Sequence, residues 1–73
     1  MKRTDFQCVV GYVGVTLDSL YECVKAEDTN PTDREDVRKD LSAVFNFLNE
    51  AKQHGFEVQT LYKWEDIKYE CIQ

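Results

Sequence analysis

The single proline of the chain, Pro31, sets the strongest limit on the fold, because it divides the sequence into two parts. The residue before a proline is pushed out of the helical region, so Asn30-Pro31 marks a break between two elements. Thr32 and Glu35 follow at the spacing of a capping box, in which each side chain accepts a hydrogen bond from the backbone N–H of the other residue. A helix is therefore predicted to begin directly after the break.

The residues after this start recur at helical spacing. One apolar stripe is formed by Val37, Leu41, Val44, Leu48 and Ala51. Lys52 and His54 lie in the last turn, where positive charge is favourable, and Gly55 has the residue type of a helix C-cap. We predict a helix over residues 33–54.

The valine-rich stretch before the break is ambiguous between helix and strand. Its valines favour a strand, and each interior glycine costs a helix about 1 kcal/mol relative to alanine. Two observations favour a helix: Thr4 and Gln7 have the spacing of a second capping box, and the apolar residues keep one helical phase throughout. We interpret the stretch as one helix over residues 4–27. The alternative is a strand over residues 6–15.

These two helices have similar lengths and a short connection, which suits an antiparallel hairpin. Residues 56–72 admit two interpretations. Their alternating apolar positions suit a β-hairpin, whereas Ile67 and Cys71 would share one face of a short helix beginning at Trp64. The predicted fold class is mainly α, an antiparallel helical hairpin with a C-terminal segment of either kind, and the alternative class is α+β, with the strand above in a small sheet. We expect a single domain over residues 1–73.

The charge balance limits the classes of partner. The net charge is −5 and the pI is about 4.7, which argues against direct nucleic-acid binding, because such binding requires clustered Lys and Arg. No apolar run approaches the roughly 20 residues of a membrane span, and no signal-peptide core follows the N-terminal Met-Lys-Arg. We therefore expect a cytoplasmic protein that binds neither nucleic acid nor membranes.

The chain has three cysteines, an odd number spread along its length. Secreted disulfide scaffolds usually carry an even set, so reduced thiols are expected. Cys8, His54 and Cys71 would lie near one another in an antiparallel hairpin, and they are the candidate ligands for a zinc ion. Their spacing contains no CxxC or HxxxH pair, so buried cysteines acting as small apolar residues are the favoured interpretation. We predict no metal and no cofactor.

Motifs for catalysis are absent from the sequence. It has one histidine, no GxSxG, Walker A, HExxH or Rossmann glycine pattern, and no evident nucleophile–base pair. Carboxylate pairs such as Asp36 and Asp40 are typical of a solvated helix face. We predict that the protein is not an enzyme.

An acidic surface around the break is the first candidate for binding a partner protein. Its residues are Glu27, Asp28, Asp33, Glu35, Asp36 and Asp40. Solubility and helix capping account for such acids, and a surface that recognises a basic partner is the functional interpretation.

An apolar surface on the reverse of the first helix is the second candidate. It is formed by Tyr12 and Val15 near Cys8, and Trp64 is the further aromatic residue assigned to it. A helix that is apolar on both sides must be covered on both sides. Residues 56–73 would cover this surface, or another chain would.

The sequence as a whole predicts a small acidic, non-enzymatic protein that acts by binding another protein with a basic surface. Small size, acidity and the absence of catalytic motifs are shared with phage proteins that inhibit host enzymes or defence systems, an analogy of composition alone. The alternatives are a small zinc-binding domain and a purely structural homo-oligomer.

Overall fold

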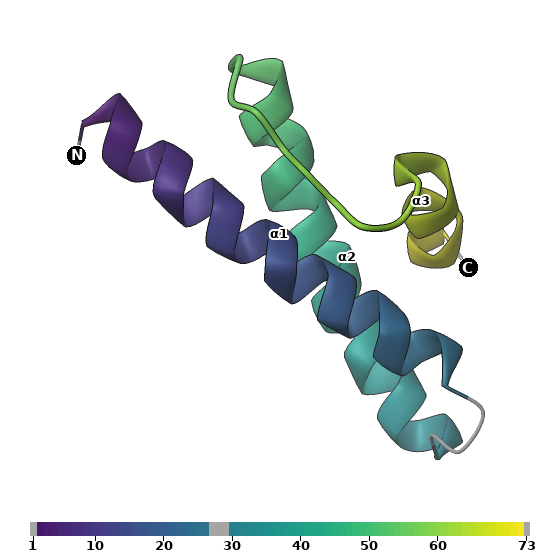
Figure 1. Cartoon of the computed structure of the whole chain (residues 1–73). Helices are drawn as coiled ribbons and strands as arrows, with labels where there is room; N and C mark the ends of the chain where they lie inside the picture. Colours follow the sequence, from purple (N-terminus) through teal and green to yellow (C-terminus); the bar gives the residue numbers. More distant parts are fainter. Residues whose placement is uncertain (1, 27–29, 73) are drawn as a thin grey trace.

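Three helices make up the fold. The computed structural model describes residues 2–26 and 30–72, and within these ranges it contains no strand. The helices are α1 (Arg3–Lys25), α2 (Pro31–Gln53) and α3 (Trp64–Ile72). Figure 1 shows α1 and α2 as two long antiparallel helices, with the short α3 beside them. The predicted mainly α class and the helical hairpin are confirmed.

The valine-rich stretch is helical along its whole length, so the strand over residues 6–15 and the α+β class are wrong. Val10 and Leu17 lie on one side of α1 and are fully buried. Burial of an aliphatic side chain contributes about 1.5–3 kcal/mol, which exceeds the roughly 1 kcal/mol that each interior glycine costs. Tertiary burial therefore outweighs the local preference of valine for a strand.

The capping box predicted for α2 is wrong. The N-cap is Asn30, whose side-chain oxygen accepts a hydrogen bond from the Thr32 N–H at 2.9 Å. Pro31 is the first helical residue, a position that suits proline because no N–H is needed there. Asparagine ranks among the best N-caps, so Thr32 lies inside the helix, which begins two residues before the predicted start at 33.

The capping box predicted for α1 is also wrong. The N-cap is Lys2, and its side chain makes no capping hydrogen bond. The amide of Gln7, expected to pair with Thr4, instead donates to the Glu57 carbonyl at 2.8 Å and accepts from the Glu57 N–H at 3.0 Å. The Gln7 side chain therefore makes a tertiary contact with Glu57 and is not available for a capping box with Thr4. At its other end α1 stops at Lys25 rather than at the predicted residue 27.

Gly55 ends α2, as predicted. Its φ of +87° is a left-handed conformation that glycine adopts without strain. The Phe56 N–H bonds to the Ala51 carbonyl at 3.0 Å and the Gly55 N–H to the Lys52 carbonyl at 3.0 Å, the paired bonds of a Schellman motif. The last helical residue is Gln53, one residue before the predicted end at 54.

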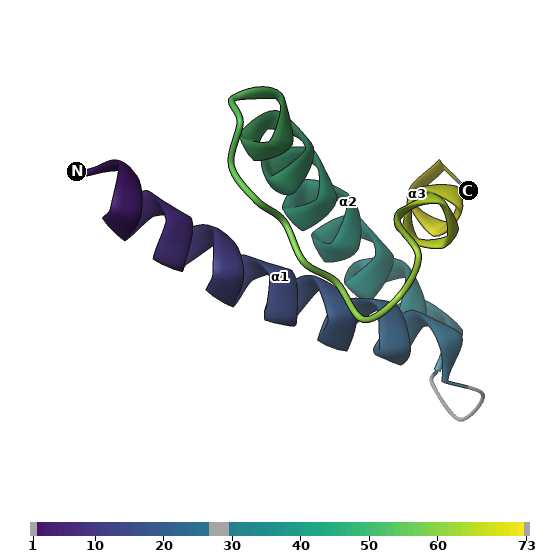
Figure 2. The same ribbon diagram turned by 45° about the horizontal axis from the view of Figure 1, so that its top comes forward.

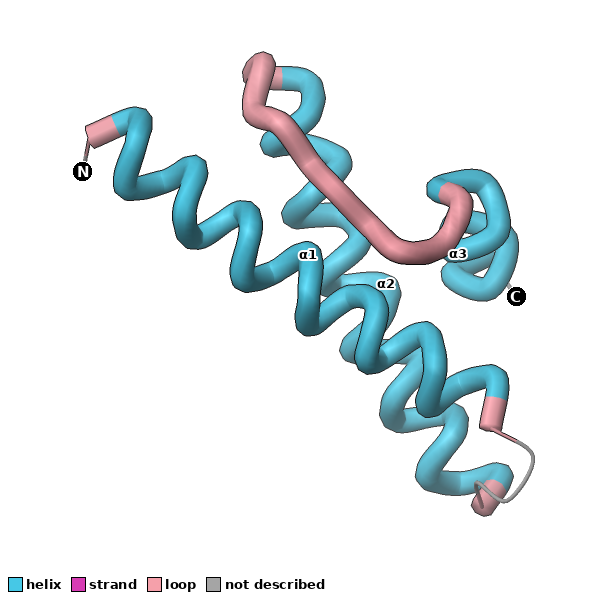
Figure 3. The backbone as a smooth tube through the Cα atoms, viewed as in Figure 1, coloured by secondary structure: helices cyan, strands magenta, loops and turns pink. Residues whose placement is uncertain are grey.

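Residues 54–63, here called the connecting segment, lead from α2 to α3. They pass along the seam between α1 and α2 without helix or strand structure (Figures 2 and 3), so the predicted β-hairpin is wrong. Gly14 allows this close passage, because a Cβ atom there would lie 2.9 Å from the Gln59 carbonyl oxygen. The predicted third helix from Trp64 is confirmed, with Ile67 fully buried and Cys71 partly buried.

A buried acid joins the three helices. Glu70 of α3 is 8% exposed and lies 3.4 Å from the Lys25 amine and 3.0 Å from an Arg38 guanidinium nitrogen. Trp64 adds a second α2–α3 contact, because its ring stacks on Phe45 at a centroid distance of 4.4 Å. The short α3 is therefore held by the two ion pairs of Glu70, by a hydrogen bond from the Ser42 hydroxyl to the Cys71 carbonyl at 3.4 Å and by the Trp64 stack, besides Ile67.

The molecule is elongated, with principal extents of 40 × 18 × 18 Å. α1 and α2 lie closest near the break and diverge toward the N-terminus of α1 (Figures 1 and 2). Phe6 fills the wider end, with ring centroids 5.9 Å from Phe47 and 4.7 Å from Phe56. Large aromatic side chains thus keep α1 and α2 in contact where the two helices separate.

Candidate functional site

The side of α1 turned away from the core carries exposed apolar residues. Tyr12 is 79% exposed and Val15 66% exposed, and together with Cys8 and Gly11 they line an open hollow of about 310 Å³. We call this side of the helix the outer face of α1. No helix in the described ranges is long and apolar enough to cross a bilayer.

A second hollow, of about 360 Å³, continues the outer face toward the break. Val15 lines both hollows, and Asp18, Ser19 and Glu22 extend the second along α1. Leu61 of the connecting segment forms its other wall and is 82% exposed. The outer face is therefore a continuous surface built from α1 and from three residues of the connecting segment, Gln59, Thr60 and Leu61.

The chemistry changes along this face from apolar to acidic. Asp18 is only 7% exposed, and one of its carboxylate oxygens accepts a hydrogen bond from the Leu61 N–H at 3.0 Å. This bond fixes the connecting segment on α1 and sets the position of Leu61. Charged residues that are buried to this degree are rare, and they are usually paired.

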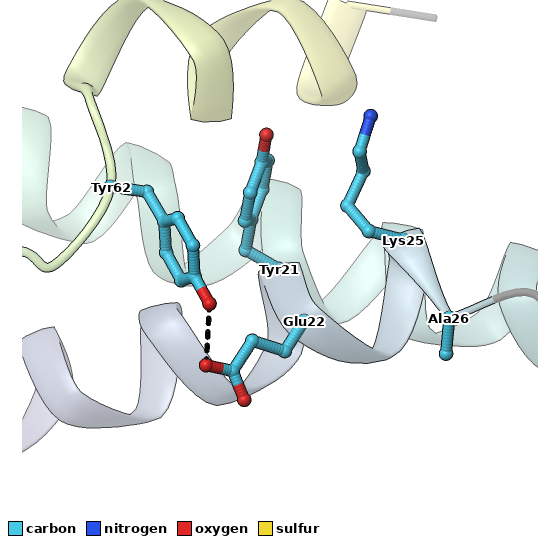
Figure 4. Close-up of a pocket in the computed structure, with 5 residues that line it drawn as sticks. All are labelled: Tyr21, Glu22, Lys25, Ala26 and Tyr62. Carbon is cyan, nitrogen blue, oxygen red and sulfur yellow. Dashed lines mark hydrogen bonds between the residues drawn. The ribbon is translucent and has the colours of Figure 1, made fainter.

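Glu22 also lines a third hollow, shown in Figure 4, together with Tyr21, Lys25, Ala26 and Tyr62. The Tyr62 hydroxyl donates to a Glu22 carboxylate oxygen at 2.5 Å. This hydrogen bond, then burial, then the negative charges of Glu22 and Asp18 raise the pKa of Tyr62 above its ordinary value of 10.0. The phenol therefore stays protonated at neutral pH and acts as a hydrogen-bond donor.

The connecting segment leaves Tyr12 and Val15 on the outer face of α1 uncovered. It passes along the side of the helix that carries Gly14 and Asp18. Trp64, assigned to this surface in the sequence prediction, lies elsewhere: it stacks on Phe45, and the Lys52 amine lies 4.3 Å from its ring centre. The apolar surface is thus formed by Tyr12 and Val15 with Leu61, and Trp64 belongs to the packing between α2 and α3.

The acidic surface around the break is separate from the outer face of α1. Its members Asp33, Glu35, Asp36 and Asp40 are exposed on α2, and Glu27 and Asp28 lie outside the described residues. Among the described residues both ion pairs are made by Glu70, so none of these four carboxylates is paired. Arg38 turns inward to Glu70, and Arg34 donates to the Ala26 carbonyl at 2.7 Å. The exposed charge here is therefore mainly negative.

The candidate zinc ligands lie on three different parts of the fold. Cys8 is exposed on the outer face of α1, His54 is exposed at the end of α2, and Cys71 lies on α3 next to Ser42. Within the described residues no group of three or more His, Cys, Asp or Glu side chains is placed to hold a metal ion. The hairpin does not bring the three candidates together as the sequence interpretation required.

Asp18, Glu22 and Leu61 were not predicted to be site residues. The sequence does mark Asp18 as unusual, because it is the only charged residue between Asp5 and Glu22 and lies in the helical phase of the buried apolar residues. Nothing in the sequence indicates Leu61 as a site residue, since its position depends on how the connecting segment folds back onto α1.

Comparison of the chain with protein-family models, curated proteins and solved structures found no match. Function is therefore inferred from the residues of this chain and their geometry.

Proposed function

We propose that the protein acts by binding another protein through the outer face of α1, and that the partner presents an apolar side chain next to a basic one. One observation carries the proposal: Tyr12, Val15 and Leu61 are 79%, 66% and 82% exposed and line two adjoining hollows. Single exposed apolar residues are common on proteins, whereas a contiguous group marks an interaction surface.

Gly11 supports the same face. A glycine inside a helix costs about 1 kcal/mol relative to alanine, and the fold offsets this at Gly14, where a Cβ atom would meet the Gln59 carbonyl oxygen. At Gly11 a Cβ atom would meet nothing within 4 Å, so packing within the chain does not require a glycine at this position. A partner whose backbone lies close to α1 beside Tyr12 and Val15 would require a glycine there, because a side chain would block the approach.

The acids favour a basic partner. Asp18 and Glu22 border the apolar part of the face, and Asp33, Glu35, Asp36 and Asp40 add negative charge on α2. Charges at the edge of an interface act mainly on the association rate and its salt dependence, and the apolar contact supplies most of the affinity. A protein that binds in this way and carries out no reaction acts by covering a surface of its partner, which is how an inhibitor works.

The test compares two exposed tyrosines. Benzoylphenylalanine at position 12 photo-crosslinks the partner in the native host, and the partner is then purified and its binding measured by calorimetry. Tyr12→Ala is expected to weaken binding by about 30-fold, the loss typical of an aromatic residue at an interface centre. The matched control is Tyr69→Ala, since Tyr69 is 63% exposed on α3 and lies off the face.

Equal affinity of both variants for the partner would refute the proposal. A native mass spectrum showing a dimer that Tyr12→Ala dissociates would replace it with the homo-oligomer. The α2 acids have their own variant, Asp36→Asn with Asp40→Asn, which leaves Asn30 and Pro31 in place at the helix start. It is expected to reduce the salt dependence of the association rate and to change the dissociation rate little.

A further inference from the structure

The second hollow on the outer face of α1 has the chemistry of a binding site for one particular side chain. It is lined by the carboxylates Asp18 and Glu22, the apolar Val15 and Leu61, and polar groups of Ser19, Gln59 and Thr60. No lysine or arginine lines it. The Thr60 hydroxyl already donates to the Tyr62 carbonyl at 2.7 Å, so toward the hollow it can only accept. The wall therefore offers negative charge and several hydrogen-bond acceptors between two apolar surfaces, and the neutral side chains of Ser19 and Gln59 can accept or donate.

Asp18 is incompletely satisfied within the chain. One carboxylate oxygen accepts from the Leu61 N–H at 3.0 Å, and the other is buried and has no donor among the described residues. The side chain is more than nine-tenths buried and takes part in no ion pair with the described residues. A buried carboxylate with a single neutral donor is unfavourable, and a cation brought next to it relieves the cost.

Glu22 is held in place and keeps an acceptor for a ligand. The Tyr62 hydroxyl occupies one of its carboxylate oxygens, and the other has no hydrogen-bond partner among the described residues (Figure 4). Lys25, the nearest cation along α1, extends toward α3, where its amine lies 3.4 Å from Glu70. The fold thus directs its own cation away from the hollow.

We propose that this hollow receives an arginine side chain of the partner protein, an inference that rests on the proposed function. A guanidinium has five donors in one plane, so it can bond the open Glu22 oxygen and the neighbouring hydroxyl oxygens while its charge lies beside Asp18. Its hydrocarbon stem packs between Val15 and Leu61. Because Val15 also lines the apolar hollow, the partner presents this arginine next to the apolar side chain that contacts Tyr12.

The test uses a small probe, so that the partner is not required. The uniformly labelled protein is titrated with N-acetyl-arginine amide and followed by NMR. Saturable shifts are expected at the amides of Ser19, Glu22 and Leu61, with affinity in the millimolar range. N-acetyl-lysine amide is expected to bind several times more weakly and N-acetyl-citrulline amide, which is uncharged, not detectably.

Variants of the same shape locate the site. Asp18→Asn and Glu22→Gln are each expected to weaken arginine binding about tenfold, while Asp36→Asn on α2 leaves it unchanged. Glu22→Gln keeps the test valid if Asp18→Asn unfolds, which circular dichroism reports. Equal shifts with the lysine probe, shifts spread over all exposed acids, or no saturable shifts would overturn the inference.

The two proposals fail separately. If Tyr12→Ala weakens partner binding and Asp18→Asn and Glu22→Gln do not, the arginine site is refuted and the protein-binding face stands. If the arginine probe binds as described and Tyr12→Ala has no effect on the partner, the arginine-binding hollow stands and the proposed binding of the partner through Tyr12 is refuted.

Discussion

At the scale of single residues, Cys8 and Cys71 show how position in the fold sets the properties of a thiol. Cys8 is exposed on the outer face of α1. Cys71 is packed against α2, and burial raises the pKa of its thiol; the neighbouring Ser42 hydroxyl lowers that pKa, and the charge of Glu70 raises it again. Since the thiolate is the nucleophile, the higher pKa and the limited access both slow the reactions of Cys71.

Alkylation of the folded protein tests this difference. At neutral pH, iodoacetamide is expected to modify Cys8 faster than Cys71, with rates measured by peptide mass spectrometry. The pH at which the Cys71 rate reaches half its maximum should lie above that of an ordinary thiol, because a raised pKa means fewer thiolates at any lower pH. In denaturant the two rates should converge. Faster modification of Cys71 than of Cys8 in the folded state would contradict the described packing of α3.

At the scale of elements, the two glycines of α1 have opposite structural roles. Gly14 lies under the connecting segment, where a Cβ atom would approach the Gln59 carbonyl oxygen to 2.9 Å. Gly11 lies three residues earlier with open space around it. Glycine thus allows close internal packing at position 14, whereas at position 11 it leaves space for a hollow on the outer face.

Alanine at each glycine separates these roles. Gly11→Ala is expected to raise the free energy of unfolding by about 1 kcal/mol, because only helix propensity changes. Gly14→Ala is expected to lower it by about 1–2 kcal/mol, because the new methyl group displaces the connecting segment. Urea denaturation followed by circular dichroism measures both. A loss of stability in Gly11→Ala would show that the outer face is not open.

The long helices were predictable from the sequence because their apolar residues keep one phase over many turns. Helix starts were not, because Asn30 competes with Thr32 as N-cap and Glu57 takes the side chain of Gln7. The path of the connecting segment was not either, since it depends on contacts with α1. The apolar half of the candidate site, Tyr12 and Val15, could be predicted from helical phase. The acidic half, Asp18 and Glu22, could be recognised only once the structure had placed Leu61 beside them.

At the scale of the whole molecule, Glu70 connects the short α3 to both long helices. α3 has nine residues, fewer than an isolated helix needs to be stable in water. Its attachment depends on Ile67, Trp64 and the pairs of Glu70 with Lys25 and Arg38. Lys25 belongs to α1 and Arg38 to α2, so one carboxylate fixes α3 against both long helices.

Glu70→Gln keeps the shape of the side chain and removes its charge. It is expected to lower the free energy of unfolding by about 1–2 kcal/mol, a value moderated by the partial exposure of both cations. Glu57→Gln is the control, because Glu57 is exposed and only its backbone groups bond to Gln7. Thermal unfolding measures both variants. Equal stability of the two would show that the Glu70 pairs contribute nothing to holding α3.

The connecting segment also has a consequence for the order of folding. Its anchoring hydrogen bonds join Leu61 to Asp18 and Glu57 to Gln7, pairs separated by 43 and 50 positions in the chain. The hairpin of α1 and α2 can instead close progressively from the break, where the residues brought together are near in sequence, so each step requires little loop entropy. We therefore expect the connecting segment to dock after the hairpin of α1 and α2 and to open before it. Such an opening would free the Asp18 carboxylate while the two long helices remain folded.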